Sequence, residues 1–132
     1  MAGKNLRRKN TCFVLVPQSN GFWLDNTSKV KIHDDTSYGV LAEVLKFIDT
    51  KLSKQYKIDA GRVYVLSHFM GGIGILTAIY QHPDRFAAAI TSAGFFGPQF
   101  DLTRIQDVPL WTFHGDADKT ALYSLSKICS MS

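Results

Sequence analysis

The order of short apolar runs and helical stretches constrains the fold of this chain more than any other feature. Between two such runs lies an apolar stretch of helical character from about 70 to 81, which Pro83 ends. Strands that are apolar on both faces and alternate with helices predict a parallel sheet with helices on both faces. The predicted fold class is therefore α/β, with a parallel sheet of about four strands flanked by helices. The predicted strands lie at 11–16, 63–66, 86–92 and 109–113.

A second helix is predicted before the 63–66 run. From about Thr36, apolar residues fall at i, i+3, i+4, i+7 and i+11, which is one stripe of an amphipathic helix. These residues are Leu41, Val44, Leu45, Ile48 and Leu52. We expect a further short helix in the tail, from about Thr120 to Cys129.

Size and charge predict one domain with a tail. The chain has 132 residues, of which 45% are apolar and 20% charged, enough for one globular domain with a substantial core. Much of the net charge of +4 lies in the first nine residues, at Lys4, Arg7, Arg8 and Lys9. A solvated basic tail over 1–10, followed by a domain over 11–132, explains this more simply than a nucleic-acid surface. We expect no nucleic-acid partner.

Neither a targeting signal nor a cysteine motif is recognisable in the sequence. The six residues "TCFVLV" before Pro17 are too few for the apolar part of a secretory signal, and no run approaches the roughly 18 to 20 apolar residues of a membrane span. A cytoplasmic location without a membrane partner is therefore expected. Cys12 and Cys129 form no close pair, which predicts free thiols, and we expect no cofactor and no metal.

The turn "SHFMG" at 67–71 joins the 63–66 strand to the helix that follows. In many hydrolases Gly-x-Ser-x-Gly makes a sharp strand-to-helix turn that lifts the serine hydroxyl above the sheet. Here Phe69 takes the position of that serine, and Ser67 and Gly71 take those of the two glycines. A bulky residue held at positive φ costs about 1–2 kcal/mol. We therefore predict that the turn relaxes and that Phe69 packs into nearby space.

Five segments match one family in order and spacing: "CFVLVPQ", "YKIDAGRVYV", "MGGIG", "HPDRFAAAI" and "DVPLWTFHGDAD". Over nearly all of residues 11–118 the chain resembles α/β-hydrolase esterases of the polyhydroxybutyrate depolymerase and feruloyl or acetylxylan esterase type. The resemblance implies a truncated α/β-hydrolase core over 11–132 and carboxylic ester hydrolysis. By the same resemblance, Asp118 stands at the triad acid, Phe69 at the missing serine, and Gly71, Gly72 and Gly74 at the packing glycines.

The departures from the family limit the chemistry. The family's oxyanion loop and catalytic histidine lie outside this chain, and loss of a triad serine alone costs about a million-fold in kcat in well-studied proteases. The family's own mechanism cannot run in the isolated chain. If the chain is active, its activity is weak or unconventional, with Asp118 as the orienting acid, His68 as the base, and Ser67 or a water as the attacking group.

Each of these residues also has a structural interpretation. Ser67 would fill the glycine position where strand and helix cross, and His68 would be a surface histidine in a turn. Trp23, Phe69, Met70 and His114 are the candidate contacts to a small ester or lactone substrate.

Two other functions remain open. A catalytically inactive pseudo-hydrolase could bind a small apolar ligand or a partner chain, and His114 with Asp116 could support metal-assisted hydrolysis of a lactone or ester. A second cluster, "HDD" at 33–35, is better explained as a helix N-terminal signal.

The resemblance also predicts a gap in the sheet. In the complete fold another strand lies between the 11–16 and 63–66 strands. Without it, either the two strands rearrange into direct contact or an open position remains, which attracts a further strand. We expect rearrangement, or a homo-oligomer that covers the exposed sheet edge.

Overall fold

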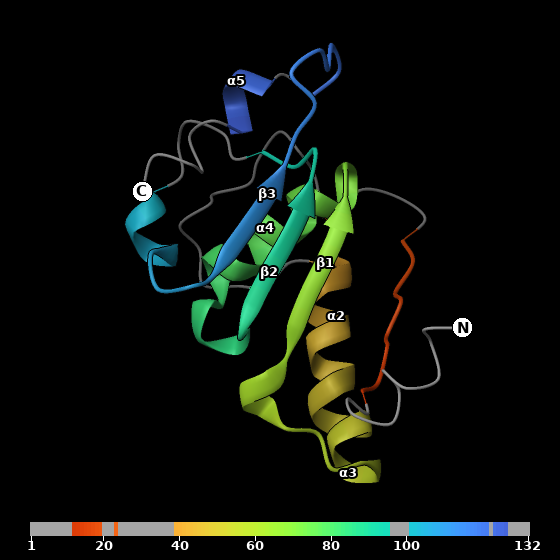
Figure 1. Ribbon diagram of the computed structural model, residues 1–132. Coiled ribbons are helices and arrows are strands. Elements are labelled where there is room, and N and C mark those ends of the chain that lie inside the picture. Colours follow the sequence, from red (N-terminus) through yellow and green to blue (C-terminus); the bar gives the residue numbers. More distant parts are fainter. Residues whose placement is uncertain (1–11, 20–22, 24–38, 96–100, 122, 127–132) are drawn as a thin grey trace, which may run out of the picture.

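The computed structural model describes residues 12–19, 23, 39–95, 101–121 and 123–126. Three parallel strands form one sheet in the order of the sequence (Figure 1). The strands are β1 (Tyr64–His68), β2 (Ala88–Ser92) and β3 (Leu110–Phe113). The α-helices are α2 (Gly39–Phe47), α3 (Ser53–Gln55), α4 (Met70–Gln81) and α5 (Tyr123–Ser126), with a π-helical segment η1 (Ile48–Leu52) between α2 and α3. Short 3-10 turns are η2 (Ala60–Arg62), η3 (Pro83–Arg85) and η4 (Leu102–Ile105).

The α/β class and its parallel sheet are confirmed. Three of the four predicted strands form within two residues of their expected limits, and α4 spans the predicted 70–81. After β1 and after β2 the chain crosses back to the start of the next parallel strand, as a parallel sheet requires.

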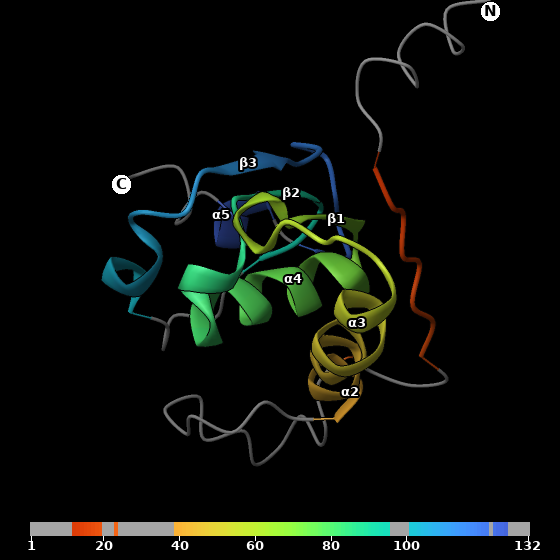
Figure 2. The same ribbon diagram turned by 90° about the horizontal axis from the view of Figure 1, so that it is seen from below.

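The core lies between the sheet and the helices. Helices α2 and α4 lie on the same side of the strands in Figure 2. On α4, Leu76, Ile79 and Tyr80 are fully buried. They pack with Phe86, which lies just before β2, and with Ala89 in β2. Leu41 and Leu45 of α2 pack against this cluster, so the predicted stripe of the first helix does face the core.

The other face of the sheet differs from the prediction. No helix of the described part of the chain lies on that side in Figure 2. Along each strand the side chains alternate between the two faces. Those that point away from α4 are exposed in β1 and β3, and in β2 Ile90 is exposed whereas Ala88 and Ser92 are half-buried. Helices therefore flank the described sheet on one face only.

The predicted strand at 11–16 is wrong. Residues 12–16 form no strand, and Phe13, Val14, Leu15 and Val16 are exposed. The segment runs alongside β1 in Figure 1 without joining the sheet, and the Phe13 ring contacts that of Tyr56 at 4.7 Å between centroids. The physical reason is that a strand needs hydrogen bonds to a neighbouring strand, and no described strand pairs with these residues.

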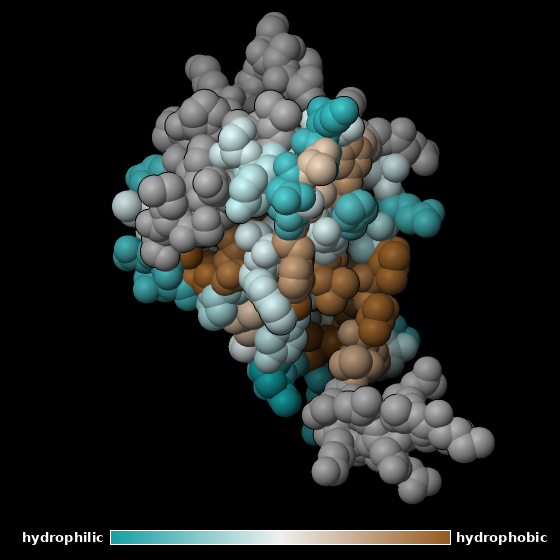
Figure 3. Space-filling view, turned by 45° about the horizontal axis from the view of Figure 1, so that its top comes forward, coloured by the Kyte–Doolittle hydropathy of each residue, from teal (hydrophilic) through white to brown (hydrophobic). Residues whose placement is uncertain are grey.

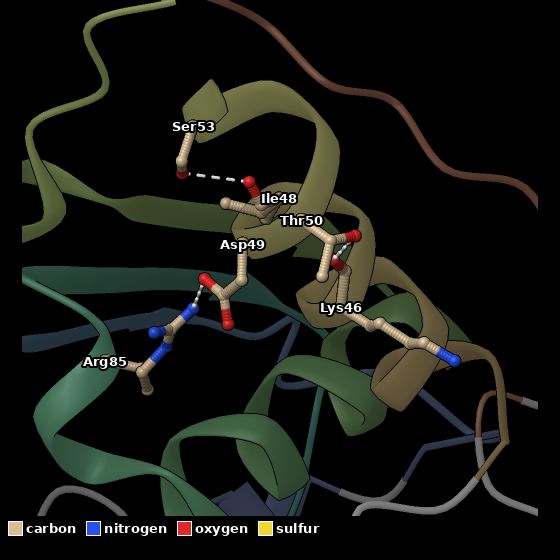
Figure 4. A network of polar contacts seen from close by, with 6 residues as sticks. All are labelled: Lys46, Ile48, Asp49, Thr50, Ser53 and Arg85. Carbon is tan, nitrogen blue, oxygen red and sulfur yellow. Dashed lines mark hydrogen bonds and ion pairs between the residues drawn. The ribbon is translucent and has the colours of Figure 1, made fainter. Parts of the chain in front are cut away.

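Hydroxyl groups accompany the change of helix type in η1 (Figure 4). Thr50 Oγ1 donates to Lys46 O at 2.7 Å, four residues back, whereas Ser53 Oγ donates to Ile48 O at 2.9 Å, five residues back. Such side-chain bonds compete with the regular helical ladder. Across the helix surface, Arg85 Nη2 donates to Asp49 Oδ1 at 2.6 Å, which ties η1 to the turn before β2.

Candidate functional site

The candidate site lies at the carboxyl edge of the sheet, where all three parallel strands end. Ligands bind at this edge in open α/β folds. His68 ends β1, Ser92 ends β2, and Phe113 ends β3. The turn at Phe69 leads from β1 into α4, and the loop from His114 to Asp118 follows β3.

The prediction that the turn at Phe69 relaxes is wrong. Phe69 has φ 51° and ψ −116°, and its side chain is exposed. Its N–H donates to Ser92 O at 2.8 Å, and its own carbonyl accepts the Ile73 N–H at 3.1 Å in the first turn of α4. Because a neighbouring strand and a helix fix both sides of the peptide, the turn keeps its shape despite the strain of a bulky side chain.

The start of α4 passes very close to the sheet. A Cβ placed on Gly72 would collide with Thr91 Oγ1 and lie 3.1 Å from Gly94 Cα, and one on Gly71 would collide with Ser67 Oγ. This close approach supports the packing role that the resemblance implies for these glycines. It is one of the two features that hold the turn in place, with the hydrogen bond to Ser92 as the other.

Ser67 and His68 lie on opposite faces of the sheet. Ser67 points toward α4, beside Gly71, and is half-buried. His68 is exposed on the other face, since neighbouring strand residues alternate. Ser67 therefore occupies the position of a small residue at the strand–helix crossing, and its hydroxyl does not face the His68 ring.

Asp118 folds the loop after β3. Its Oδ1 accepts the N–H of Thr120 at 2.8 Å and that of Ala121 at 3.0 Å. These two backbone hydrogen bonds lower the pKa of Asp118 below its ordinary value of 3.8, and electrostatic attraction to His114 and His68 lowers it further. The carboxylate is thus held ionised and oriented by the backbone, within the electrostatic reach of His68.

His114 is buried beneath the same loop. Its Nε2 lies 2.6 Å from Ala121 O and 3.6 Å from Asp118 Oδ2. Because a carbonyl oxygen only accepts, Nε2 carries the hydrogen, and the buried Nδ1 has no partner among the described residues. This arrangement links the two ends of the loop, and it leaves the His114 side chain 3% exposed.

Ser92 is a residue that sequence reasoning missed. It pairs with His68 in the register of β1 and β2, so both side chains lie on the same face at the carboxyl edge. No local motif marks this serine. Only the register between two strands, which the sequence does not state, brings it beside the histidine.

The remaining predicted residues are spread around the start of α4. Trp23 packs over the glycines of α4, with its Cβ 2.9 Å from where a Cβ on Gly74 would stand, and Met70 is half-buried as the first residue of that helix. Within the described ranges, no three His, Cys, Asp or Glu side chains form a group that could hold a metal ion. The "HDD" cluster at 33–35 lies outside the described residues.

A hollow of about 440 Å³ lies at the opposite end of the strands. It is formed by the segments that precede β2 and β3, and its lining includes Asp84, Phe86, Arg104 and Val108. It does not include any of the candidate site residues. The helices of the described part are all too short or too polar to cross a membrane.

Comparison with known proteins finds similarity among solved structures. No protein-family model matches the chain, and neither does any curated protein. A solved structure described as a thermostable esterase matches with a TM-score of 0.61 and 39% sequence identity, over 67% of this chain and 23% of that esterase. This chain is similar to part of an esterase. The match agrees with the three parallel strands and flanking helices, and it supports the resemblance to an α/β-hydrolase core.

Proposed function

We propose that this chain is an α/β-hydrolase-type protein that hydrolyses small carboxylic esters or lactones weakly, at the carboxyl edge of its sheet. The observation that carries the proposal is the turn at Phe69, whose positive φ and close glycine packing are retained in a fold similar to an esterase. The chain spans 23% of the length of that esterase, so its activity and its substrate are proposals that the assays below test.

In the proposed reaction, His68 is the general base. It takes the proton of an attacking hydroxyl as that oxygen bonds to the carbonyl carbon, and it returns the proton to the alkoxide when the ester C–O bond breaks. Asp118, whose carboxylate is held in place by the backbone N–H groups of Thr120 and Ala121, is the acid that accompanies this base. With Ser92 as the attacking group the product is an acyl-enzyme, which water then hydrolyses; with water the acid forms directly.

The face of the sheet supports Ser92 or water over Ser67 as the attacking group. Ser92 lies beside His68 on the same face, whereas Ser67 lies beneath α4 beside Gly71. The two serines therefore form a matched pair for mutagenesis, because each lies in a strand next to the same turn.

The test is hydrolysis of short-chain aryl esters and acyl lactones by the purified chain and by four variants: Ser67→Ala, Ser92→Ala, His68→Ala and Asp118→Asn. Asp84→Asn, exposed at the other end of the sheet, is the control. We expect His68→Ala to lower kcat about 100-fold or more, the usual worth of a general base. A loss with Ser92→Ala but not Ser67→Ala identifies Ser92 as the attacking group, and no loss with either identifies water.

Activity that all four variants retain would refute the proposal. Activity lost only on addition of a chelator would favour metal-assisted hydrolysis near His114 and Asp116 instead. Each assay needs circular dichroism on the same sample, because Asp118 also folds the loop in which it lies.

A second function has one observation in its favour. Phe69 places an exposed aromatic ring at the tip of the turn, where the resembling family has its serine. A catalytically inactive protein that binds a small apolar ligand there would need this ring. Under that alternative, Phe69→Ala abolishes binding of an apolar ester analogue, and neither the wild-type chain nor any variant hydrolyses esters.

A further inference from the structure

The face of the sheet opposite α4 is an apolar surface that a single copy of this chain leaves in water. Five large side chains form it, and we call them the open face: Tyr64 (62% exposed), Leu66 (74%), Ile90 (39%), Trp111 (62%) and Phe113 (46%). Single exposed apolar residues are common on soluble proteins, but a contiguous group of this kind marks an interaction site.

The strand register makes these residues contiguous. Leu66, Ile90 and Trp111 are aligned across the three strands in one row. Phe113 is the next residue of β3 on the same face after Trp111, and the centroids of the two rings lie 4.7 Å apart. Brown apolar surface in Figure 3 gathers on the side where β1 and residues 12–19 lie, so the surface continues past the sheet edge. The exposed Phe13, Val14 and Val16 extend it there.

We infer that the open face is the interface of a homodimer, in which two copies pack sheet against sheet. This inference does not rest on the proposed hydrolase function. His68 and Ser92 end their strands on the same face, in one row with Phe113, so the dimer would cover the proposed site and hydrolysis there would belong to the monomer. The open face carries no Asp, Glu, Lys or Arg, since none occurs in the three strands. Besides Tyr64, His68 is the titratable side chain that these strands place on this face, so a partner recognised by charge finds little to pair with here, whereas a second copy of the same face brings no fixed charge to repel it.

The area is sufficient for such a dimer. A whole aromatic side chain offers about 150–250 Å², so at their observed exposures the five residues present roughly 500 Å² per copy. Two copies would bury about 1,000 Å², the lower limit of a specific interface, before residues 12–16 are added. Two sheets that face each other about 10 Å apart make a sandwich core, and a two-fold axis builds that core from one face alone.

Two phenylalanines provide a matched test. Phe113 on the open face is 46% exposed, and Phe47 on α2 is 44% exposed but lies on the helical side of the sheet. Sedimentation equilibrium should give the wild-type chain twice its mass of 14.7 kDa at about 100 μM, a concentration that saturates an interface of micromolar affinity. Phe113→Lys should raise the dissociation constant about tenfold or more, and Phe47→Lys should leave it unchanged.

Trp111→Lys is the second variant, and circular dichroism identifies any variant that has failed to fold. A folded variant at Phe113 or Trp111 with wild-type dimerisation would overturn the inference. A wild-type chain that stays monomeric at about 100 μM would overturn it as well. So would open-ended association into larger species, since a two-fold interface closes at two copies.

Discussion

The two faces of the sheet are built from alternate residues of the same three strands, but their side chains differ in kind. The face beneath α4 presents small or medium residues such as Val65, Ala89 and Thr91, and α4 fills the space with Leu76, Ile79 and Tyr80. The open face presents large residues, among them Trp111 and Leu66, and no described element covers them. Both faces carry apolar side chains, and the size of those side chains reflects how near the covering layer comes.

The largest expected effect is the difference in folding stability lost when Leu76 and Leu66 are each changed to alanine. Leu76→Ala in α4 should destabilise the fold by about 2–5 kcal/mol, because it leaves a cavity in the core. Leu66→Ala on the open face should cost within about 0.5 kcal/mol in dilute solution, where the inferred dimer is dissociated. Urea unfolding of both variants measures this difference. Equal losses would mean that the open face is covered even in the dilute monomer.

A smaller effect is expected at the close approach of α4 to the sheet. Gly72→Ala should cost about 1–3 kcal/mol, because the new methyl group meets Thr91 Oγ1 and the backbone of Gly94. Gly115→Ala is the control, since a Cβ there meets nothing within 4 Å. Thermal unfolding compares the two. A harmless Gly72→Ala would mean that α4 lies further from β2 than described.

Two buried threonines between the sheet and α4 should respond in opposite ways to loss of the hydroxyl group. Thr91 Oγ1 has no hydrogen-bond partner among the described residues, so Thr91→Val should be neutral or stabilise the fold by about 1 kcal/mol. Thr77 Oγ1 donates to Ile73 O at 3.0 Å, so Thr77→Val should instead cost about 1 kcal/mol. Chemical denaturation of both variants checks the opposite signs. A destabilised Thr91→Val would indicate that a bound water satisfies this hydroxyl.

At the carboxyl edge, Ala93 repeats the strain seen at Phe69. Its φ is 52°, and its N–H donates to Phe113 O at 2.8 Å. Ala93→Gly should stabilise the fold by up to about 1 kcal/mol, because glycine adopts positive φ without a steric cost. The same change at Ala78, inside α4, should cost about 1 kcal/mol. Melting temperatures of the pair test this, and a loss of stability at position 93 would contradict it.

The smallest effect concerns pH. The lowered pKa of Asp118 means that the folded chain favours the ionised carboxylate more than the unfolded chain does. This stabilisation is fully present above the ordinary value of 3.8 and is lost as the pH falls through the lower pKa of the folded state. The stability difference between wild type and Asp118→Asn should therefore shrink as the pH falls below about 4. Urea unfolding at a series of pH values measures it, and a constant difference would contradict it.

The sequence predicted the strands and α4 because their patterns are local. The residues of a run such as "VYVL" favour a strand by their own propensity, and Pro83 ends the preceding helix regardless of how that helix packs. Residues 12–16 have an equally clear pattern, but no strand forms, because pairing depends on a neighbour that local sequence does not specify.

The site was less predictable than the fold. The resemblance pointed to Asp118 in the loop after β3. The pairing of Ser92 with His68 depends on strand register, which the sequence does not reveal. The turn at Phe69 misled local reasoning because the cost of its positive φ is offset by contacts that arise only in the folded chain, such as the hydrogen bond to Ser92 O.

The persistence of that turn has an evolutionary consequence. Its backbone depends on Ser92 O and on the glycines of α4, and none of these contacts requires a serine at position 69. A phenylalanine codon becomes a serine codon through a single base change. Such a change would place a hydroxyl on a turn whose backbone conformation is already fixed, so the shape of the turn and the chemistry of its side chain can change separately.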